Sequence, residues 1–272
     1  MSYYKVLGLQ KEPFSTSPDP YFFYPSVSHE TALKRAEIAL RLRRGLSVIL
    51  GDVGAGKTTL SRALINAFRD EPEFIFHMIL DPVYESEYQF LHTLVNMFGI
   101  VPPARSEKDF KDALERYLFN AGVEEQKTVV LIIDEGQKMS PESIEVLRTL
   151  LNYETNEYKL LQLVIMAQME FIPRTENIHN FTDRITLRYV LNSLDEEETG
   201  KMIRFRLQRA GYERKRELFT AEAVKLIYLS THGHPRKIAM LCHYALETLI
   251  MKERDVVDGE IVEGLVYDGS LQ

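Results

Sequence analysis

Residues 51–58 carry the strongest constraint on what this chain can fold into. The apolar run Leu46–Leu50 is followed by Gly51-Asp52-Val53-Gly54-Ala55-Gly56-Lys57-Thr58. Glycines at this spacing, closed by Lys and Thr, are the signature of a phosphate-binding loop if a strand precedes them and a helix follows. Leu46–Leu50 has the length and apolarity of a buried strand, and residues 58–68 have a helical pattern. We therefore predict a P-loop that binds the phosphates of ATP.

Each residue type in this loop suits a phosphate ligand. The glycines let backbone N–H groups wrap the phosphate oxygens, and the following helix adds the partial positive charge of its N-terminus. We expect Lys57 to reach the β- and γ-phosphates and the Thr58 hydroxyl to bind Mg²⁺. We place every residue from Gly51 to Thr59 among the ATP-binding residues.

A second predicted strand ends in two acids. The apolar run Val129–Ile133 is followed by Asp134 and Glu135. Nucleotides bind at the carboxyl ends of the strands in open α/β sheets, so these acids fall where a nucleotide is expected. We expect Asp134 to hold Mg²⁺ through water and Glu135 to polarise the attacking water as a general base. Paired with the P-loop, they predict an ATPase that uses ATP and Mg²⁺.

Strands and helices alternate through the middle of the chain. The predicted strands are 46–50, 74–80, 128–133, 160–167 and 185–191, and the predicted helices are 28–42, 58–68, 86–98, 107–120 and one opened by Ser140 and Pro141. We expect Ser28 and Ser140 to be N-caps. This alternation predicts an α/β fold with a parallel sheet covered on both faces.

The pattern changes to helices alone after Leu194. Ser193-Leu194-Asp195-Glu196 is typical of a capping box for a helix that runs to Arg209 and ends at Gly211. Further helices are predicted at 220–230, 235–252 and 258–266. We therefore expect three parts: a Pro/aromatic segment and helix packing on the core at 1–44, an α/β nucleotide-binding core at 45–194, and a small all-helical lid at 195–268.

The composition favours a globular protein of the cytoplasm. No apolar run approaches the ~20 residues that a membrane helix needs, and the N-terminus shows no secretory signal. Cys242 is the only cysteine, so it forms no internal disulfide, and its apolar helical surroundings predict a small buried side chain.

The formal net charge of -7 argues against a surface devoted to nucleic acid. Arginine and lysine nevertheless crowd two short stretches: Arg35, Arg41, Arg43 and Arg44 form one, and Arg204, Arg206, Arg209, Arg214, Lys215 and Arg216 form the other. We favour their interpretation as solvated helix faces.

Several motifs together resemble those of AAA+ ATPases: the acids after residue 133, the helical C-terminal part and Gly233-His234-Pro235-Arg236. Within that group, the chain is similar to the ExeA/GspA-type ATPases of general secretion, which are related to MuB/TnsC-type ATPases. The similarity rests on the N-terminal block (Gly8-Leu9, residues 12–20, Phe23-Tyr24 and residues 28–33) and on residues 150–155 and 160–168. It covers residues 3–266 and implies an AAA+ core of five parallel strands in the order 5-1-4-3-2, followed by a helical lid.

The resemblance also implies roles for individual residues. Gln168 matches the sensor that touches the γ-phosphate or the attacking water, and Arg236 matches the second sensor, in the lid. Arg184, with Arg188 close behind, falls where the family carries its arginine finger. A guanidinium suits these roles because it is always charged and grips phosphate oxygens bidentately. Tyr24 and His29 are candidates to flank the adenine, although core packing also accounts for them.

The resemblance leaves several biological roles open. The family's chains usually continue into a membrane span and a periplasmic peptidoglycan-binding part. This sequence ends at Gln272 without an integral membrane segment, so we expect a separate partner to anchor it to any envelope assembly at the inner membrane. The leading interpretation is an ATPase that forms a ring or filament, with a hexamer expected, and remodels or positions a partner of a secretion, pilus or polysaccharide assembly. The alternatives are a MuB/TnsC-like regulator of transposition that binds DNA, a nucleotide-gated scaffold with little turnover, and a small-molecule kinase, which the lid disfavours.

Overall fold

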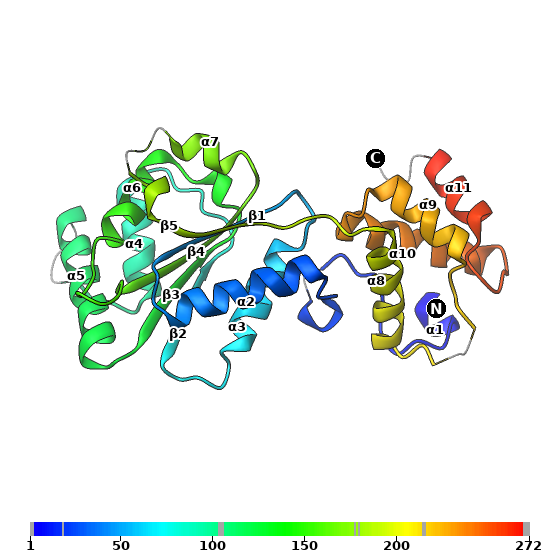
Figure 1. The fold of residues 1–272 in the computed structure, drawn as a ribbon, viewed down its shortest axis with the longest axis horizontal. Helices are drawn as coiled ribbons and strands as arrows, with labels where there is room; N and C mark the ends of the chain where they lie inside the picture. Colours follow the sequence, from blue (N-terminus) through cyan, green and yellow to red (C-terminus); the bar gives the residue numbers. More distant parts are fainter. Residues whose placement is uncertain are drawn as a thin grey trace. The chain divides into compact units, whose positions relative to one another are not determined.

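A parallel sheet occupies the middle of the chain (Figure 1). The computed structural model describes residues 3–17, 19–102, 106–176, 178, 180–213 and 216–268. The strands are β1 (Leu46–Leu50), β2 (Phe74–Ile79), β3 (Thr128–Ile133), β4 (Leu161–Ala167) and β5 (Ile185–Val190). Their order, β2-β3-β4-β1-β5, is the predicted one counted from the other edge. All paired strands are parallel, so their carboxyl ends share one edge of the sheet.

The burial of each strand follows from its place in the sheet. The central strands β1, β3 and β4 are buried at every position, which explains why they are almost continuously apolar in sequence. The edge strand β5 instead alternates between partly buried and exposed residues. A strand with one covered face needs apolar residues only at every second position.

Helices cover both faces of the sheet. They are α2 (Val27–Arg41), α3 (Lys57–Ala67), α4 (Glu87–Met97), α5 (Glu107–Phe119), α6 (Pro141–Leu150) and α7 (Phe171–Glu176), with short turns η2 (Asn120–Glu124), η3 (Gly136–Lys138) and η4 (Thr182–Arg184). Figure 1 shows α2 and α3 on one face, with α4, α5 and α6 on the other. Side chains of α4, α5 and α6 join alternate residues of β1, β3 and β4 in one apolar core. The predicted α/β architecture is therefore confirmed.

A second compact unit consists of helices. It comprises the described residues of Met1–Ser28, Val53–Thr59 and Asn192–Gln272, and we call it the helical unit; His29–Asp52 and Leu60–Leu191 form the sheet unit. Its helices are α1 (Tyr3–Val6), η1 (Pro20–Phe22), α8 (Glu196–Arg209), α9 (Ala221–Thr231), α10 (Pro235–Met251) and α11 (Gly259–Tyr267). Cys242 is fully buried in α10, as predicted, and this burial raises the pKa of its thiol. In the described ranges, no helix is long and apolar enough to cross a membrane.

Two predicted helix caps are wrong. The helix α2 begins at Val27, so Ser28 lies inside its first turn, and the Ser28 hydroxyl accepts a hydrogen bond from the backbone N–H of Asn192. The cap of α8 is Asp195, whose carboxylate accepts from the Glu198 N–H, rather than Ser193. The cap at Ser140 is confirmed, because its hydroxyl accepts from the Ser143 N–H.

The Pro- and aromatic-rich segment before α2 belongs to the helical unit and packs on its longer helices. Leu9, Phe14 and Phe22 are buried in the same apolar cluster as α8, α9 and α10. Arg206 of α8 fixes the segment, because its guanidinium donates to the backbone carbonyls of Phe22 at 3.2 Å and Ser15 at 3.3 Å. Burial lowers the pKa of Arg206 to about 10, so the side chain keeps its charge at neutral pH.

We expect Arg206→Met to destabilise the protein by about 1–3 kcal/mol, because it leaves two partly buried carbonyl groups without donors. Denaturant unfolding measures this change, and limited proteolysis should show faster cleavage before residue 28. Arg204→Met is the matched control, since Arg204 lies on the same helix and is exposed. Equal stability of the two variants would contradict a role of Arg206 in fixing the N-terminal segment.

Candidate nucleotide-binding site

The predicted P-loop joins β1 to α3. Gly54 has φ +80 and Gly56 has φ +91, values that other residues adopt only under strain. The side chain of Lys57, the first residue of α3, is buried, with 5% of its surface exposed. The strand, loop and helix required by the motif are thus all present, with the helix N-terminus directly after the last glycine. Along the rest of the loop, Gly51 and Ala55 are buried, Asp52 and Val53 are exposed, and Thr58 and Thr59 are partly buried.

The predicted second sensor lies against this loop. The backbone N–H of Arg236 donates to the Gly54 carbonyl at 3.3 Å. A Cβ atom at Gly54 would lie 2.8 Å from the Cβ of Arg236, so a larger residue there would collide with the start of α10. Gly233, in the same motif, packs closely on the chain just before α8, because a Cβ on it would stand 1.8 Å from the Leu194 carbonyl oxygen. The Gly-x-Pro-Arg motif therefore brings Arg236 to the P-loop within the helical unit.

The two acids occupy the turn that follows β3. Asp134 is buried, with 2% of its surface exposed, and its carboxylate accepts from the Glu135 N–H at 3.0 Å. Glu135 has φ +52, a left-handed conformation that is strained for a residue other than glycine. Gly136 then packs so closely on β4 that an added Cβ would lie 2.4 Å from a methyl carbon of Ile165.

The end of β4 meets both the P-loop and the acids. The N–H of Gly51 donates to the Ala167 carbonyl at 3.1 Å, which places the next residue, Gln168, beside the start of the loop. The Gln168 N–H donates to the side-chain oxygen of Gln137 at 3.0 Å. The side-chain nitrogen of Gln137 donates in turn to the Glu135 carboxylate at 2.7 Å. Sequence reasoning missed Gln137, and the only signal was a polar residue two positions after Glu135.

Comparison with known proteins identifies this arrangement. Residues 40–174 match a family model described as AAA domain. The chain is 33% identical over 99% of its length to General secretion pathway protein A of Aeromonas hydrophila. Residues 40–174 are an AAA domain. The chain spans 50% of the length of the Aeromonas protein. The resemblance to the GspA type that the sequence indicated is confirmed.

Solved structures share the fold of this AAA domain and of the helices after it. The ORC2 protein of Aeropyrum pernix, in ADPNP-ADP complexes, has a TM-score of 0.63 and 16% identity, and the similarity covers 91% of this chain and 70% of that one. The ORC1 protein of Aeropyrum pernix, in complex with DNA, has a TM-score of 0.66 and 15% identity, with 95% of this chain and 69% of that one covered. Identities this low show the fold alone, which is the AAA+ P-loop ATPase fold.

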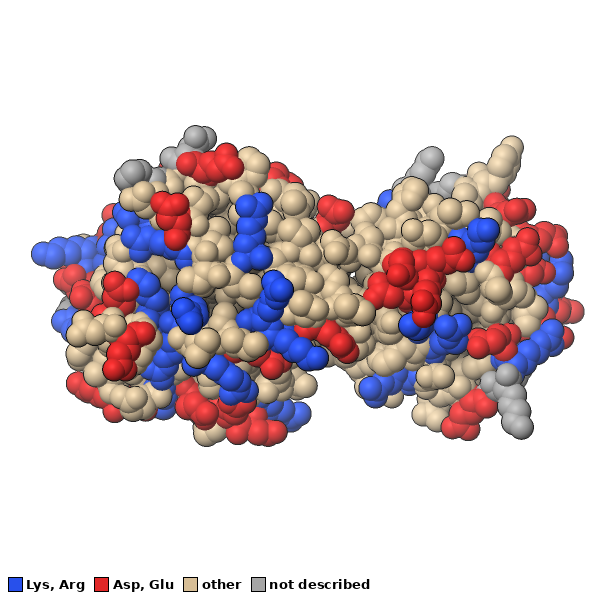
Figure 2. Space-filling view, viewed as in Figure 1, with Lys and Arg blue, Asp and Glu red and all other residues tan. Residues whose placement is uncertain are grey.

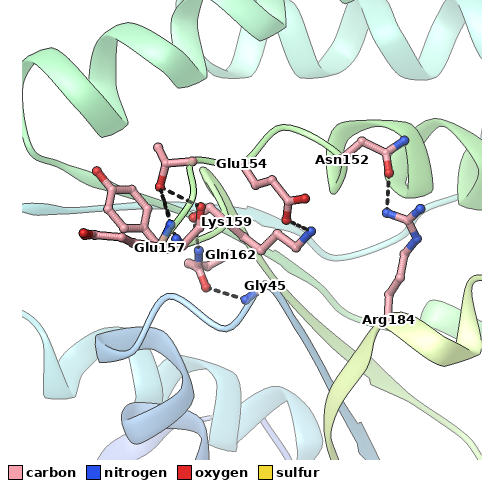
Figure 3. A network of polar contacts seen from close by, with 9 residues as sticks. Gly45, Asn152, Glu154, Glu157, Lys159, Gln162 and Arg184 are labelled. Atoms are coloured by element: carbon pink, nitrogen blue, oxygen red, sulfur yellow. Dashed lines mark hydrogen bonds and ion pairs between the residues drawn. The ribbon is translucent and has the colours of Figure 1, made fainter.

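The two finger candidates lie away from the edge of the sheet at which β1, β3 and β4 end. Arg184 immediately precedes β5, whose first residue pairs with Leu46, the first residue of β1. Gly51 follows the other end of β1, which is ~17 Å away at ~3.3 Å per residue. The guanidinium of Arg184 donates to the Asn152 side chain (Figure 3). Arg188 is exposed in the middle of β5, where it pairs in register with Val48.

The two adenine candidates occupy different surroundings. Tyr24 packs edge-on against Phe205 of α8, with ring centroids 5.8 Å apart, and burial raises the pKa of its phenol. His29 is buried in the first turns of α2. Packing thus explains both residues, and their role in adenine binding stays a prediction.

Most of the clustered arginines that the structure describes have structural partners. Arg41 pairs with Glu71 at 2.6 Å, and Arg43 donates to Thr128 at 2.9 Å while its guanidinium covers the Tyr158 ring. Arg206 fixes the N-terminal segment and Arg209 lies over the Tyr21 ring. Arg214 and Lys215 lie outside the described residues. Figure 2 shows basic and acidic side chains interspersed on the face in view, which agrees with solvated surfaces rather than one basic stripe.

Proposed function

We propose that the AAA domain binds Mg·ATP and hydrolyses it. The observation that carries the proposal is the edge at which three neighbouring strands end: β1 leads into the P-loop, β4 ends before Gln168, and β3 ends before Asp134 and Glu135. A parallel sheet presents these ends together, at the place where open α/β sheets bind nucleotides. The AAA domain match at residues 40–174 supports this reading.

Each side chain at this edge then has a chemical role. Lys57 compensates the charge of the β- and γ-phosphates, and Glu135 takes the proton of the attacking water. Gln168 orients that water or the γ-phosphate, and Arg236, whose backbone N–H contacts Gly54 of the P-loop, binds the γ-phosphate. The Thr58 hydroxyl would hold Mg²⁺ and the Asp134 carboxylate would hold it through water, since Mg²⁺ takes few oxygen ligands from a protein and keeps several waters. The metal, when bound, neutralises the charge that develops on the phosphates.

We further propose that hydrolysis is coupled to self-association into a ring or filament, with a hexamer as the expected ring. The position of Arg184 at the far end of β1 supports this coupling, because an arginine there serves a neighbour's phosphates rather than its own. The similarity to General secretion pathway protein A favours a partner in an envelope secretion assembly. The protein then works in the cytoplasm and reaches the inner membrane through that partner.

Lys57→Ala tests the binding half of this function. The change removes the side-chain cation of the loop, so the β- and γ-phosphates lose their compensating charge, and we expect ATP affinity to fall at least ~10-fold. Calorimetry with Mg²⁺ present measures the affinity. Lys225→Ala, at an exposed lysine of α9, is the matched control. Unchanged affinity in Lys57→Ala would overturn the P-loop assignment, and tight binding by the natural chain without turnover would favour a nucleotide-gated scaffold.

A further inference from the structure

A buried glutamine links two residues of the proposed catalytic site. Gln137 lies in η3, and only 6% of its surface is exposed. Its Nε2 donates to Oε2 of Glu135 at 2.7 Å, and its Oε1 accepts from the backbone N–H of Gln168 at 3.0 Å. One amide thus connects the end of β3 with the end of β4, although the two partners are 33 positions apart in sequence.

These two bonds require an amide of this length. A backbone N–H can only donate and an ionised carboxylate can only accept, so the side chain between them must offer one acceptor and one donor. The partners also fix which end of the amide faces which neighbour. Glutamate would offer two acceptors, methionine would offer no donor, and asparagine would be one methylene too short to reach both partners.

The turn that carries Gln137 is fixed on both sides. Arg174 of α7 donates to the backbone carbonyls of Gln137 and Met139, the second at 3.3 Å. Gly136 packs directly on Ile165 of β4, where no Cβ would fit. The amide therefore has a defined place from which to hold the neighbouring carboxylate.

Glu135 needs such a hold. Its left-handed backbone, φ +52, takes its side chain out of the alternation that an extended strand imposes, so strand geometry does not orient the carboxylate. Within the described part of the chain, the Gln137 amide donates a hydrogen bond to this carboxylate. A general base must stay within hydrogen-bond reach of the water that it deprotonates.

We propose that Gln137 is a positioning residue for ATP hydrolysis, which holds the Glu135 carboxylate and ties it to Gln168 at the end of β4. The proposal rests on the proposed ATPase function. Gln137 acts through Glu135, so its loss impairs the chemical step and leaves the phosphate-binding loop intact. Misplacing a reacting group by about 1 Å can cost ~10²-fold in rate.

Two variants of similar volume test the role. Gln137→Met removes the acceptor and the donor, and we expect kcat to fall ~10- to 100-fold while ATP affinity and KM change less than about twofold. Gln137→Glu keeps the acceptor for the Gln168 N–H and loses the donor to Glu135, so kcat should fall as well. Steady-state ATPase assays measure kcat and KM, and calorimetry measures ATP affinity. The melting temperature of each variant shows whether the fold is intact.

A second buried glutamine gives the control. Gln162 of β4 also accepts from a backbone N–H, that of Gly45 at 2.8 Å, and donates to a carbonyl, that of Lys159 at 2.7 Å (Figure 3). It lies at the opposite end of the sheet from Gln168, so Gln162→Met should lower the melting temperature and leave the kcat of the folded protein unchanged.

The outcomes separate this inference from the function on which it rests. If the natural chain does not hydrolyse ATP, the proposed function fails. If it does, and Glu135→Gln is inactive while Gln137→Met keeps its kcat or loses no more than Gln162→Met, the positioning role alone is overturned.

Discussion

Glu135→Gln is expected to bind ATP as tightly as the natural chain and to hydrolyse it ~10²-fold more slowly or worse. The amide has the shape of the carboxylate and can still receive the hydrogen bond from Gln137, but it cannot take a proton from water. The variant should also accumulate as an ATP-bound oligomer, because the step that ends this state is blocked. Phosphate release at saturating ATP and size-exclusion chromatography measure the two effects.

The left-handed conformation of Glu135 makes Gln the substitution of choice. Alanine would remove the side chain at a backbone position already under strain, and a fall in activity could then reflect a moved turn. Glu115→Gln, at an exposed position of α5, makes the same chemical change away from the nucleotide edge. If Glu135→Gln hydrolyses ATP at the natural rate, Glu135 is not the general base, and another group activates the water.

The sequence predicts the strands and the strand–loop–helix arrangement around residues 51–58 well, because both depend on local patterns. The run Thr128–Ile133 is apolar at nearly every position, and a central parallel strand buried on both faces is the structure that such a run favours. The P-loop is equally local, since its glycines must adopt positive φ between a strand and a helix. The prediction of the strand order depended on the family resemblance, because composition and periodicity do not indicate which strands are neighbours.

The failures occur where a choice depends on distant residues. Ser193 and Asp195 can both cap a helix; in the structure the Leu194 N–H donates to the distant Gly233 carbonyl, and Asp195 caps α8, which starts at Glu196. The short helix α7 contains Pro173 in its first turn, where proline is tolerated. Proline usually indicates the end of a helix, so the sequence does not indicate this one.

Gln137 was missed, and Arg206 was interpreted as part of a solvated helix face, for the same reason. Each is polar and lies beside other polar residues in sequence, so each is expected at the surface. Gln137 is buried because β4 brings Gln168 to it, and Arg206 is partly buried because the N-terminal segment packs over α8. Neither contact leaves a periodic signal, since the partners are separated by long stretches of chain.

We expect Arg184→Ala to bind ATP normally and to lose most of its hydrolysis, because Arg184 is expected to complete a neighbour's site. An arginine finger is worth ~10³–10⁵ in rate where one acts. For the same reason, the activity of the natural chain per subunit should rise with protein concentration. Asn152→Ala distinguishes the loss of the guanidinium from the loss of its hydrogen bond, because it removes the hydrogen bond to Arg184 and keeps the guanidinium. Its loss of rate should be far smaller.

Mixing Arg184→Ala with Lys57→Ala tests whether the arginine acts across an interface. Each variant is expected to be inactive alone, since one lacks the finger and the other lacks the loop cation. In a head-to-tail assembly, a subunit with an intact P-loop can sit beside one with an intact Arg184. Random mixing in equal amounts creates such interfaces at about a quarter of the positions, so up to about a quarter of the natural turnover should return.

The mixed assembly must be shown to form before its activity is interpreted. Differently tagged variants that co-purify establish that both subunits share one oligomer. Recovery of turnover in that oligomer then requires that the guanidinium came from a different chain than the working P-loop, because neither variant carries both. If the variants co-assemble and no turnover returns, Arg184 does not act in trans. The same mixing with Arg188→Ala in its place then tests the other arginine, which is exposed in the middle of the same edge strand.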